Sequence, residues 1–463
     1  MSSGRRKVAV FILSLVILST LGLVYQKIRA NGKPANLVLL LVDALRADHL
    51  SCYGYSRKTT PSIDRIAENA VICTNAYSQS NWTCPAMASL FTGTYPFVHK
   101  VYNDPATIKD RFSVIPPGLT VIPEALIGRG FETAAFTACG WVSQNSNFDR
   151  GFDEFRLLER SDRIILEQAE KFVRGKGQKK FFLYVHLLDV HDYFFLKRSQ
   201  GKFLKSAYSL SENLKALPGK DPAEIYSFLG NIRGKEDLSR EDLDYLIDHY
   251  DSALYRLDEL VGHFIKTLEN EKLLKKTVII ITADHGERFL EQGELTHGGF
   301  SLDNKVIRVP LIIHSQKLFP KSVERRELVE TIDIFPTVID LFDLEEIRSS
   351  DLSQLQGQSI LNPIWAKAVM AENSARDRIK VIWRNWSYVY HFINNSRELY
   401  DLSQDPGETC NVFEQHKIVA KKIHRAMLKK INDSLELSQK IVPEDAKIND
   451  HVRETLKSLG YIH

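Results

Sequence analysis

Two acidic residues and a histidine stand where this chain could hold a divalent cation. Asp43 follows an apolar run at residues 36–42, and Asp284 and His285 follow a second apolar run at residues 277–282. Carboxylate oxygens and an imidazole nitrogen are common ligands of zinc and manganese. For each aspartate taken alone, the alternative is an N-cap or turn position, which is common after a strand. The pair together with the histidine favours a metal site.

A threonine close to a predicted helix start is the candidate nucleophile. Pro85 suits the first turn of a helix, so Thr83 would lie just before the helix N-terminus, where free N–H groups favour an anionic substrate. A threonine hydroxyl needs a metal or a base to lower its pKa before it can attack. The alternative is that Thr83 only caps the helix, and this motif alone leaves both interpretations open.

The elements that must position these residues read as an alternating α/β chain. Apolar runs of this length, rich in β-branched residues, are typical of strands buried on both faces of a parallel sheet, and a third run lies at residues 181–187. Functional groups of such sheets gather at the carboxyl ends of the strands. A long helix is predicted after a capping box at Ser239 and Asp242. After about residue 340 the pattern changes to strands at 366–372, 379–384 and 388–393, followed by a helix from about 414.

The N-terminus predicts a membrane anchor. Three basic residues at positions 5–7 precede an uncharged, mainly apolar stretch at residues 8–25, which is long enough to span a bilayer core. No clean cleavage site follows, so an uncleaved helix is favoured over a signal peptide. Basic residues on both flanks leave the orientation open. We expect a single-pass membrane protein with an extracytoplasmic catalytic domain.

Composition excludes some classes of protein. The chain has 463 residues, which is enough for one large domain and a smaller one. Its net charge of +3 is close to balance and does not indicate nucleic-acid binding. Its five cysteines are scattered without the spacing of a zinc motif or a disulfide framework.

Several blocks, in order and over nearly everything after residue 34, resemble the sulfatase family within the alkaline phosphatase superfamily. The first is residues 42–55 (Val-Asp-Ala-Leu-Arg-Ala-Asp-His-Leu-Ser-Cys-Tyr-Gly-Tyr). The others are residues 60–64, 90–96, 147–153, 186–191, 282–287, 307–311, 398–402, 405–408 and 459–461. The resemblance implies a large, mixed but mostly parallel sheet flanked by helices, plus a small C-terminal α+β subdomain with an antiparallel sheet. The expected divisions are 1–34 (anchor and linker), 35–345 (catalytic domain) and 346–463 (smaller subdomain).

Carried over by position, the resemblance also assigns roles to individual residues. It implies metal ligands at Asp43, Asp284 and His285, with Thr83 as nucleophile and fourth ligand. His191 is similar to a histidine that contacts the bound ester. His297 is similar to a family position on the opposite rim, although its loop is about one residue longer than usual.

The departures from the family pattern concern the nucleophile and the metal. Sulfatases proper carry Cys or Ser, converted to formylglycine, with Pro two residues on and Arg four residues on. Here those positions hold Thr83, Pro85 and Met87. Threonine cannot give the aldehyde, and Cys84 is out of register. His285 stands where calcium-binding members have Asn, which favours Mn or Zn, with Ca as the alternative. Ala44 replaces a second calcium-site Asp, and the family's Lys-Trp-His block is replaced at residues 139–141.

Three hypotheses follow from these residues. The first is a membrane-anchored, metal-dependent hydrolase of sulfate or phosphate esters that uses Thr83. The second is a phosphoryl-type transferase of the same superfamily, which passes the group to an acceptor other than water. The third is a sulfatase-like binding protein without catalysis. The expected partners are an anionic ester substrate and, through the N-terminal helix, a membrane.

Overall fold

The computed structural model describes residues 34–103, 111–195, 201–215, 222–232, 238–344, 352–362, 367–448 and 450–458. The predicted anchor at residues 8–25 lies outside these ranges. Within them, no helix is both long and apolar enough to span a bilayer.

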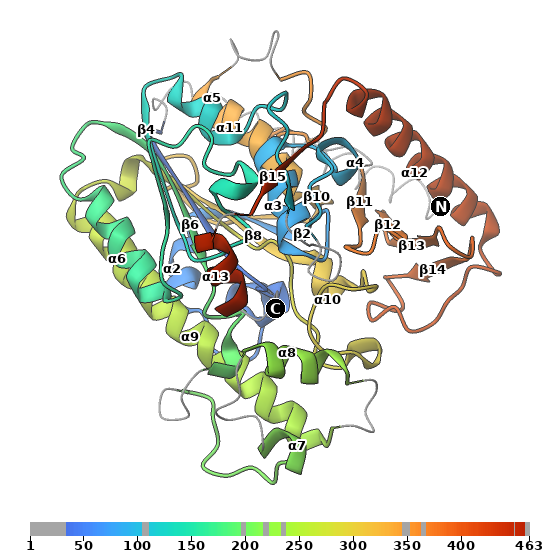
Figure 1. Ribbon diagram of the computed structural model, residues 1–463. Helices are drawn as coiled ribbons and strands as arrows, with labels where there is room; N and C mark the ends of the chain where they lie inside the picture. The colour runs from blue at the N-terminus through green and yellow to red at the C-terminus, as the bar shows by residue number, and fades with distance from the viewer. Residues whose placement is uncertain are drawn as a thin grey trace, which may run out of the picture.

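A nine-stranded sheet forms the centre of the described structure (Figure 1). Eight strands follow the order β10-β2-β8-β7-β1-β6-β4-β5, and β9 pairs with β2. Strand β8 runs antiparallel to β2 and β7, and the other pairs are parallel. The strands are β1 (Asn36–Val42), β2 (Ala70–Tyr77), β4 (Phe131–Thr137), β5 (Glu154–Leu157), β6 (Lys180–Leu187), β7 (Thr277–Thr282), β8 (Arg308–His314), β9 (Val323–Arg325) and β10 (Val329–Glu330).

The predicted central strands are confirmed. Strands β1 and β7 are buried along their whole length, as their continuous apolar character requires. Their register pairs Leu41 with Thr282, so both chains leave the sheet at the same edge.

Helices cover both faces of this sheet. Figure 1 shows α2, α6 and α9 on one side and α3, α5 and α11 on the other. The long helix α9 begins after the predicted capping box, in which the Ser239 side chain accepts a hydrogen bond from the Asp242 N–H. The bounds are α2 (Pro61–Ala67), α3 (Thr83–Thr92), α5 (Ile122–Ile127), α6 (Asp162–Val173), α9 (Arg240–Asn270) and α11 (Ile334–Phe342). Shorter helices are α4 (Pro96–His99), α7 (Glu212–Lys215), α8 (Pro222–Gly230) and α10 (Asn304–Ile307).

A separate four-stranded antiparallel sheet carries helix α12, as expected for the C-terminal part (Figure 1). Its elements are β11 (Ala368–Glu372), β12 (Arg378–Trp383), β13 (Trp386–His391), β14 (Arg397–Asp401) and α12 (Lys417–Ser438). Strand β14 was not among the predicted strands. These two sheets confirm the predicted fold class.

The last part of the chain returns to the larger part of the molecule. Strand β15 (Glu444–Lys447) pairs antiparallel with β3 (Arg111–Val114), and α13 (Asp450–Ser458) follows it. The division into two parts near residue 345 stays a prediction. A C-terminal subdomain that begins there would share the strand pair of β15 and β3 with the catalytic domain.

Candidate active site

Residues from three distant segments meet at the carboxyl edge of the large sheet. Asp43 follows β1, Asp284 and His285 follow β7, and Thr83 is the first residue of α3. Ligand atoms of Asp43, Asp284 and His285 all lie within 4.8 Å of one another, and the three side chains are buried. The structure therefore brings together the four residues that the sequence proposed as metal ligands.

The ring nitrogen His285 Nε2 lies at the centre of this group. It is 3.2 Å from Thr83 Oγ1, 3.3 Å from Asp284 Oδ2 and 3.6 Å from Asp43 Oδ1. Ligands about 2.0 Å from a tetrahedral cation are about 3.3 Å apart. The other ring nitrogen, Nδ1, lies 2.9 Å from the main-chain oxygen of Gly286, which can only accept a hydrogen bond. A neutral His285 therefore turns the lone pair of Nε2 toward the oxygens.

Two of these oxygens lack a hydrogen-bond donor. Asp43 Oδ1 and Asp284 Oδ2 are buried and have no hydrogen-bond partner among the described residues. Buried carboxylate oxygens are costly when left uncompensated, and here they face an imidazole lone pair. A divalent cation would satisfy all four groups, so the site fits the predicted metal. The ligand roles themselves stay predictions.

Local structure explains why Gly286 follows the histidine. A Cβ at this position would lie 2.1 Å from the main-chain oxygen of Lys305, closer than two such atoms can approach. The Gly286 N–H donates to the main-chain oxygen of Val306 at 2.6 Å. Only glycine lets the loop after β7 pass this close to the chain before β8.

The helix starts one residue earlier than predicted, so Thr83 lies inside it and not just before it. Helix α3 begins at Thr83, and its N-cap residue is Trp82, which makes no side-chain capping bond. The Thr83 hydroxyl instead contacts His285, and the N-cap interpretation of Thr83 is therefore wrong.

The neighbouring thiol of Cys84 lies in a different environment. Its sulfur accepts a hydrogen bond from Asn103 Nδ2 at 3.1 Å, and burial raises the pKa of the thiol to about 12. Successive helical residues are about 100° apart around the axis, which separates the two side chains.

Two further histidines predicted from the sequence reach the same place. The His297 ring stacks on His285 with centroids 4.2 Å apart, and the His191 ring lies 5.0 Å from His297. Burial lowers the pKa of His297. Burial would also lower the pKa of His191, but Asp43 and Asp192 raise it above the ordinary histidine value. The His191 Nδ1 atom is 2.9 Å from Asp192 Oδ1.

The pKa of the Asp43 carboxyl is shifted by its surroundings. Burial would raise it, but the charge on His191 and the hydrogen bond from His186 lower it well below the ordinary range. Asp43 is therefore a carboxylate at all physiological pH values.

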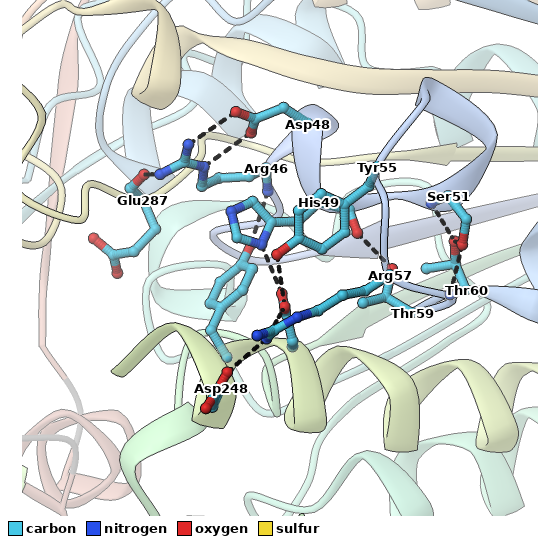
Figure 2. Close-up of polar contacts among 12 residues, drawn as sticks. Arg46, Asp48, His49, Ser51, Tyr55, Arg57, Thr59, Thr60, Asp248 and Glu287 are labelled. Carbon is cyan, nitrogen blue, oxygen red and sulfur yellow. Dashed lines mark hydrogen bonds and ion pairs between the residues drawn. The ribbon is translucent and has the colours of Figure 1, made fainter. Parts of the chain in front are cut away.

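Sequence reasoning missed the residues that hold the two ligand loops together. Figure 2 shows the Arg46 guanidinium between the Asp48 carboxylate and the main chain of Glu287. The Arg46 Nη1 atom donates to the Glu287 carbonyl at 3.2 Å and to Glu291 at 2.7 Å. The Tyr250 hydroxyl, on α9, accepts from the Arg46 N–H and donates to the Ala44 carbonyl, both at 2.8 Å. Arg46 thus ties the loop after β1 to the loop after β7.

The same loop is fixed to α9 further along. His49 Nδ1 lies 2.7 Å from Asp251 Oδ1, and Arg57 pairs with both Asp248 and Asp251 (Figure 2). Arg46 and His49 stood inside the first family-like block, but nothing in the sequence indicated their partners.

The fold and this edge of the sheet define a hydrolase of the alkaline phosphatase type. The sulfatase family model matches residues 35–344, and the chain belongs to the sulfatase family. It is a sulfatase-like ester hydrolase, as predicted.

The relatives share the architecture at low sequence identity. Arylsulfatase K of Xenopus laevis is 21% identical over 83% of this chain and 80% of its own length. Choline-sulfatase of Rhizobium meliloti is 23% identical over 83% of both chains. Among solved structures, a protein in complex with its substrate D-glucosamine-2-N,6-O-disulfate superposes with a TM-score of 0.66 at 19% identity, covering 88% of this chain and 99% of that one. A phosphonate monoester hydrolase of Agrobacterium radiobacter gives a TM-score of 0.65 at 18% identity, covering 87% and 96%. These likenesses confirm the sulfatase-like fold.

Proposed function

We propose that this chain hydrolyses sulfate esters with Thr83 as the nucleophile, in a metal-dependent reaction. Asp43, Thr83, Asp284 and His285 would hold one divalent cation, with zinc or manganese preferred to calcium because one ligand is an imidazole nitrogen. The observation that carries the proposal is the contact of 3.2 Å between Thr83 Oγ1 and His285 Nε2, beside two carboxylate oxygens without a donor. The cation would lower the pKa of the Thr83 hydroxyl and offset charge on the ester.

Thr83 and His191 would carry the bond changes. The Thr83 hydroxyl first gives its proton to bulk water. Its oxygen then attacks the ester sulfur, and the bond from sulfur to the alcohol oxygen breaks. His191, whose raised pKa suits a proton donor and whose Nδ1 is held by Asp192, protonates the departing alcohol. Water then attacks the sulfur and gives its proton to His191, and the bond from sulfur to Thr83 breaks. His297, beside His285, contacts the ester oxygens.

The test is a substrate panel with the full chain in detergent. Sulfate esters of a phenol and of an amino sugar are compared with the matched phosphate esters, after chelation and after zinc, manganese or calcium is added singly. We expect sulfate-ester turnover that zinc or manganese restores. Faster turnover of the phosphate esters, or transfer to an added alcohol, would replace the proposal with a phosphoesterase or a transferase. Metal binding without any turnover would support a binding protein.

The nucleophile is tested by neighbouring substitutions. Thr83→Ala should lower kcat by several orders of magnitude, while Thr83→Ser keeps the hydroxyl and retains part of the activity. Cys84→Ala is the matched control, because its sulfur contacts Asn103 rather than the ligand group, and it should keep most of the activity. A dead Cys84→Ala beside an active Thr83→Ala would assign the chemistry to the cysteine.

We also propose that residues 8–25 anchor the enzyme in a membrane as a single-pass helix, with the catalytic domain on the extracytoplasmic side. The uncharged apolar stretch behind a basic cluster supports this placement. Membrane fractionation and protease accessibility of intact cells or spheroplasts test it. Recovery of the uncleaved full chain in a salt-washed soluble fraction would contradict an anchor.

A further inference from the structure

We propose that Asp43, Cys139 and His186 form a second site for a soft divalent cation, which shares Asp43 with the first. One ligand atom from each of these residues lies within 4.8 Å of the other two, and all three side chains are buried. The sulfur, nitrogen and oxygen ligands match zinc better than calcium or magnesium.

The order of the strands creates this second group. Strands β7, β1, β6 and β4 are neighbours in the sheet. At or just beyond their carboxyl ends they carry Asp284, Asp43, His186 and Cys139, in that order. Asp43 therefore lies between two sets of ligands, one on the β7 side and one on the side of β6 and β4.

The two oxygens of Asp43 face opposite sets. Oδ1 lies 3.6 Å from His285 Nε2, and Oδ2 lies 3.3 Å from His186 Nε2. The second distance is again about the separation of two ligands of a tetrahedral cation. A carboxylate that presents one oxygen to each side can bridge two cations about 3.5–4 Å apart, the spacing of two-metal hydrolytic centres.

Tyr184 orients the imidazole of this set. Its hydroxyl lies 2.9 Å from His186 Nδ1, so Nε2 points at Asp43. A hydrogen bond to the second ring nitrogen is the usual support of a metal-bound histidine. The same contacts are also compatible with a hydrogen bond between His186 and Asp43 that shares one proton and involves no metal.

Cys139 separates the two outcomes. It is 2% exposed, forms no disulfide and follows β4 at the position where the chain leaves the sheet. A hydrogen bond between His186 and Asp43 does not involve a thiol, whereas a soft cation held by this group would take the Cys139 thiolate as its third ligand. Binding would release the thiol proton and leave a fourth position open for water or substrate, as in catalytic zinc sites.

The test is a cobalt titration of the full chain in detergent after chelation. Cobalt(II) replaces zinc and gives a thiolate-to-cobalt charge-transfer absorption when sulfur is a ligand. We expect two equivalents per chain, one of which brings this absorption. Cys139→Ser should bind one equivalent without the absorption. Asp284→Asn should also bind one equivalent but keep the absorption, because it damages only the first site.

The control is Cys84→Ser, which changes a buried thiol outside both groups and should keep both equivalents and the absorption. One equivalent without the absorption in the unaltered chain would overturn the proposal in favour of the proton-shared pair. An absorption that survives Cys139→Ser would also overturn it and would assign the band to another thiol, such as the exposed Cys410.

A measurement without substitutions covers the case in which Cys139→Ser does not fold. X-ray absorption of the zinc-loaded full chain should contain a sulfur neighbour at about 2.3 Å. Its absence would refute the second site. Neither readout depends on turnover. The proposal of a second metal site can therefore be refuted while the proposal of Thr83 as nucleophile stands, and the Thr83 proposal can be refuted while the second site stands.

Discussion

Two clusters of buried carboxylates in this protein differ in the charges that surround them. Between the two sheets, Glu330 and Asp333 surround the Lys367 ammonium, which lies 2.9 Å from Glu330 Oε2 and 2.5 Å from Asp333 Oδ1. At the carboxyl edge of the large sheet, Asp43 and Asp284 each present an oxygen with no hydrogen-bond donor among the described residues.

We interpret the cluster of Glu330, Asp333 and Lys367 as structural (the structural cluster), and the group around Asp43 and Asp284 as functional. Where the chain provides its own ammonium, the charges are neutralised on folding and nothing further needs to bind. Burial lowers the pKa of Lys367, but Glu330 and Asp333 raise it above its ordinary value, so the ammonium stays charged. Where the chain leaves oxygens facing an imidazole lone pair, the cation that we propose would complete the charge balance.

The largest expected effect is a loss of activity from a substitution at the carboxyl edge of the large sheet. Asp284→Asn should lower kcat by roughly 10³-fold or more, because it removes the charge of a proposed metal ligand. The unfolding free energy of the metal-free chain should stay the same or rise by about 1 kcal/mol, since the new amide can donate to His285 Nε2. Steady-state kinetics and denaturant unfolding of the same preparations measure both quantities. A clear loss of metal-free stability would place this carboxylate with the structural cluster.

The second expected effect is a loss of stability without a loss of activity, from a substitution in the cluster of Glu330, Asp333 and Lys367. Lys367→Met should lower the unfolding free energy by about 3–5 kcal/mol, because it removes the ammonium that pairs directly with both buried carboxylates and leaves them only the charge of Lys430. Activity measured well below the unfolding temperature should persist. The control is Lys429→Met, which breaks an exposed pair with Asp433 and should leave unfolding unchanged. Loss of metal affinity in Lys367→Met would contradict the separation of the two regions.

Another buried carboxyl, Glu372 at the end of β11, is neutralised by a proton instead. Burial raises its pKa to about 7, above an ordinary value of 4.5, although the Tyr102 hydroxyl bond opposes the shift. The folded state therefore binds the proton more tightly than the unfolded state. Its contribution to stability is complete below pH 4.5 and is lost as pH rises through 7, a total of about 3 kcal/mol.

Glu372→Gln should flatten this part of the profile of unfolding free energy against pH, and should make the chain more stable than the unaltered protein at pH 8. Because other groups titrate in the same window, the difference between the two proteins is the quantity to measure. An identical slope in both would show that Glu372 is ionised in the folded chain.

The smallest effect concerns the residue that connects the two ligand loops. Arg46→Lys loses the forked contacts to Asp48 and to the Glu287 carbonyl, and should lower both kcat and metal affinity by about 10–100-fold. The control is Arg57→Lys, in the same polar network, whose ion pairs are with Asp248 and Asp251 on α9 and whose guanidinium lies over the Phe203 ring. An equal loss in both variants would indicate a general effect on the loop after β1 rather than alignment of the site.

Much of the fold could be predicted from local patterns. The apolar runs that become β1 and β7, and the capping box before α9, depend on neighbours in sequence, so they could be read directly. The sequence also predicted that Asp43 and Asp284 leave the sheet at one edge, since parallel strands align their carboxyl ends. The anchor at residues 8–25 and the metal roles stay predictions.

The sequence by itself therefore determined which side-chain types gather and at which edge of the sheet they lie. Only the tertiary structure decided which residues flank Asp43, because the order β7-β1-β6-β4 places His186 and Cys139 beside it although 143 and 96 positions separate them in the chain. It also decided that Thr83 faces His285 instead of capping its helix. That choice depends on the rotation of α3 about its axis, which packing against the sheet fixes and no local pattern encodes.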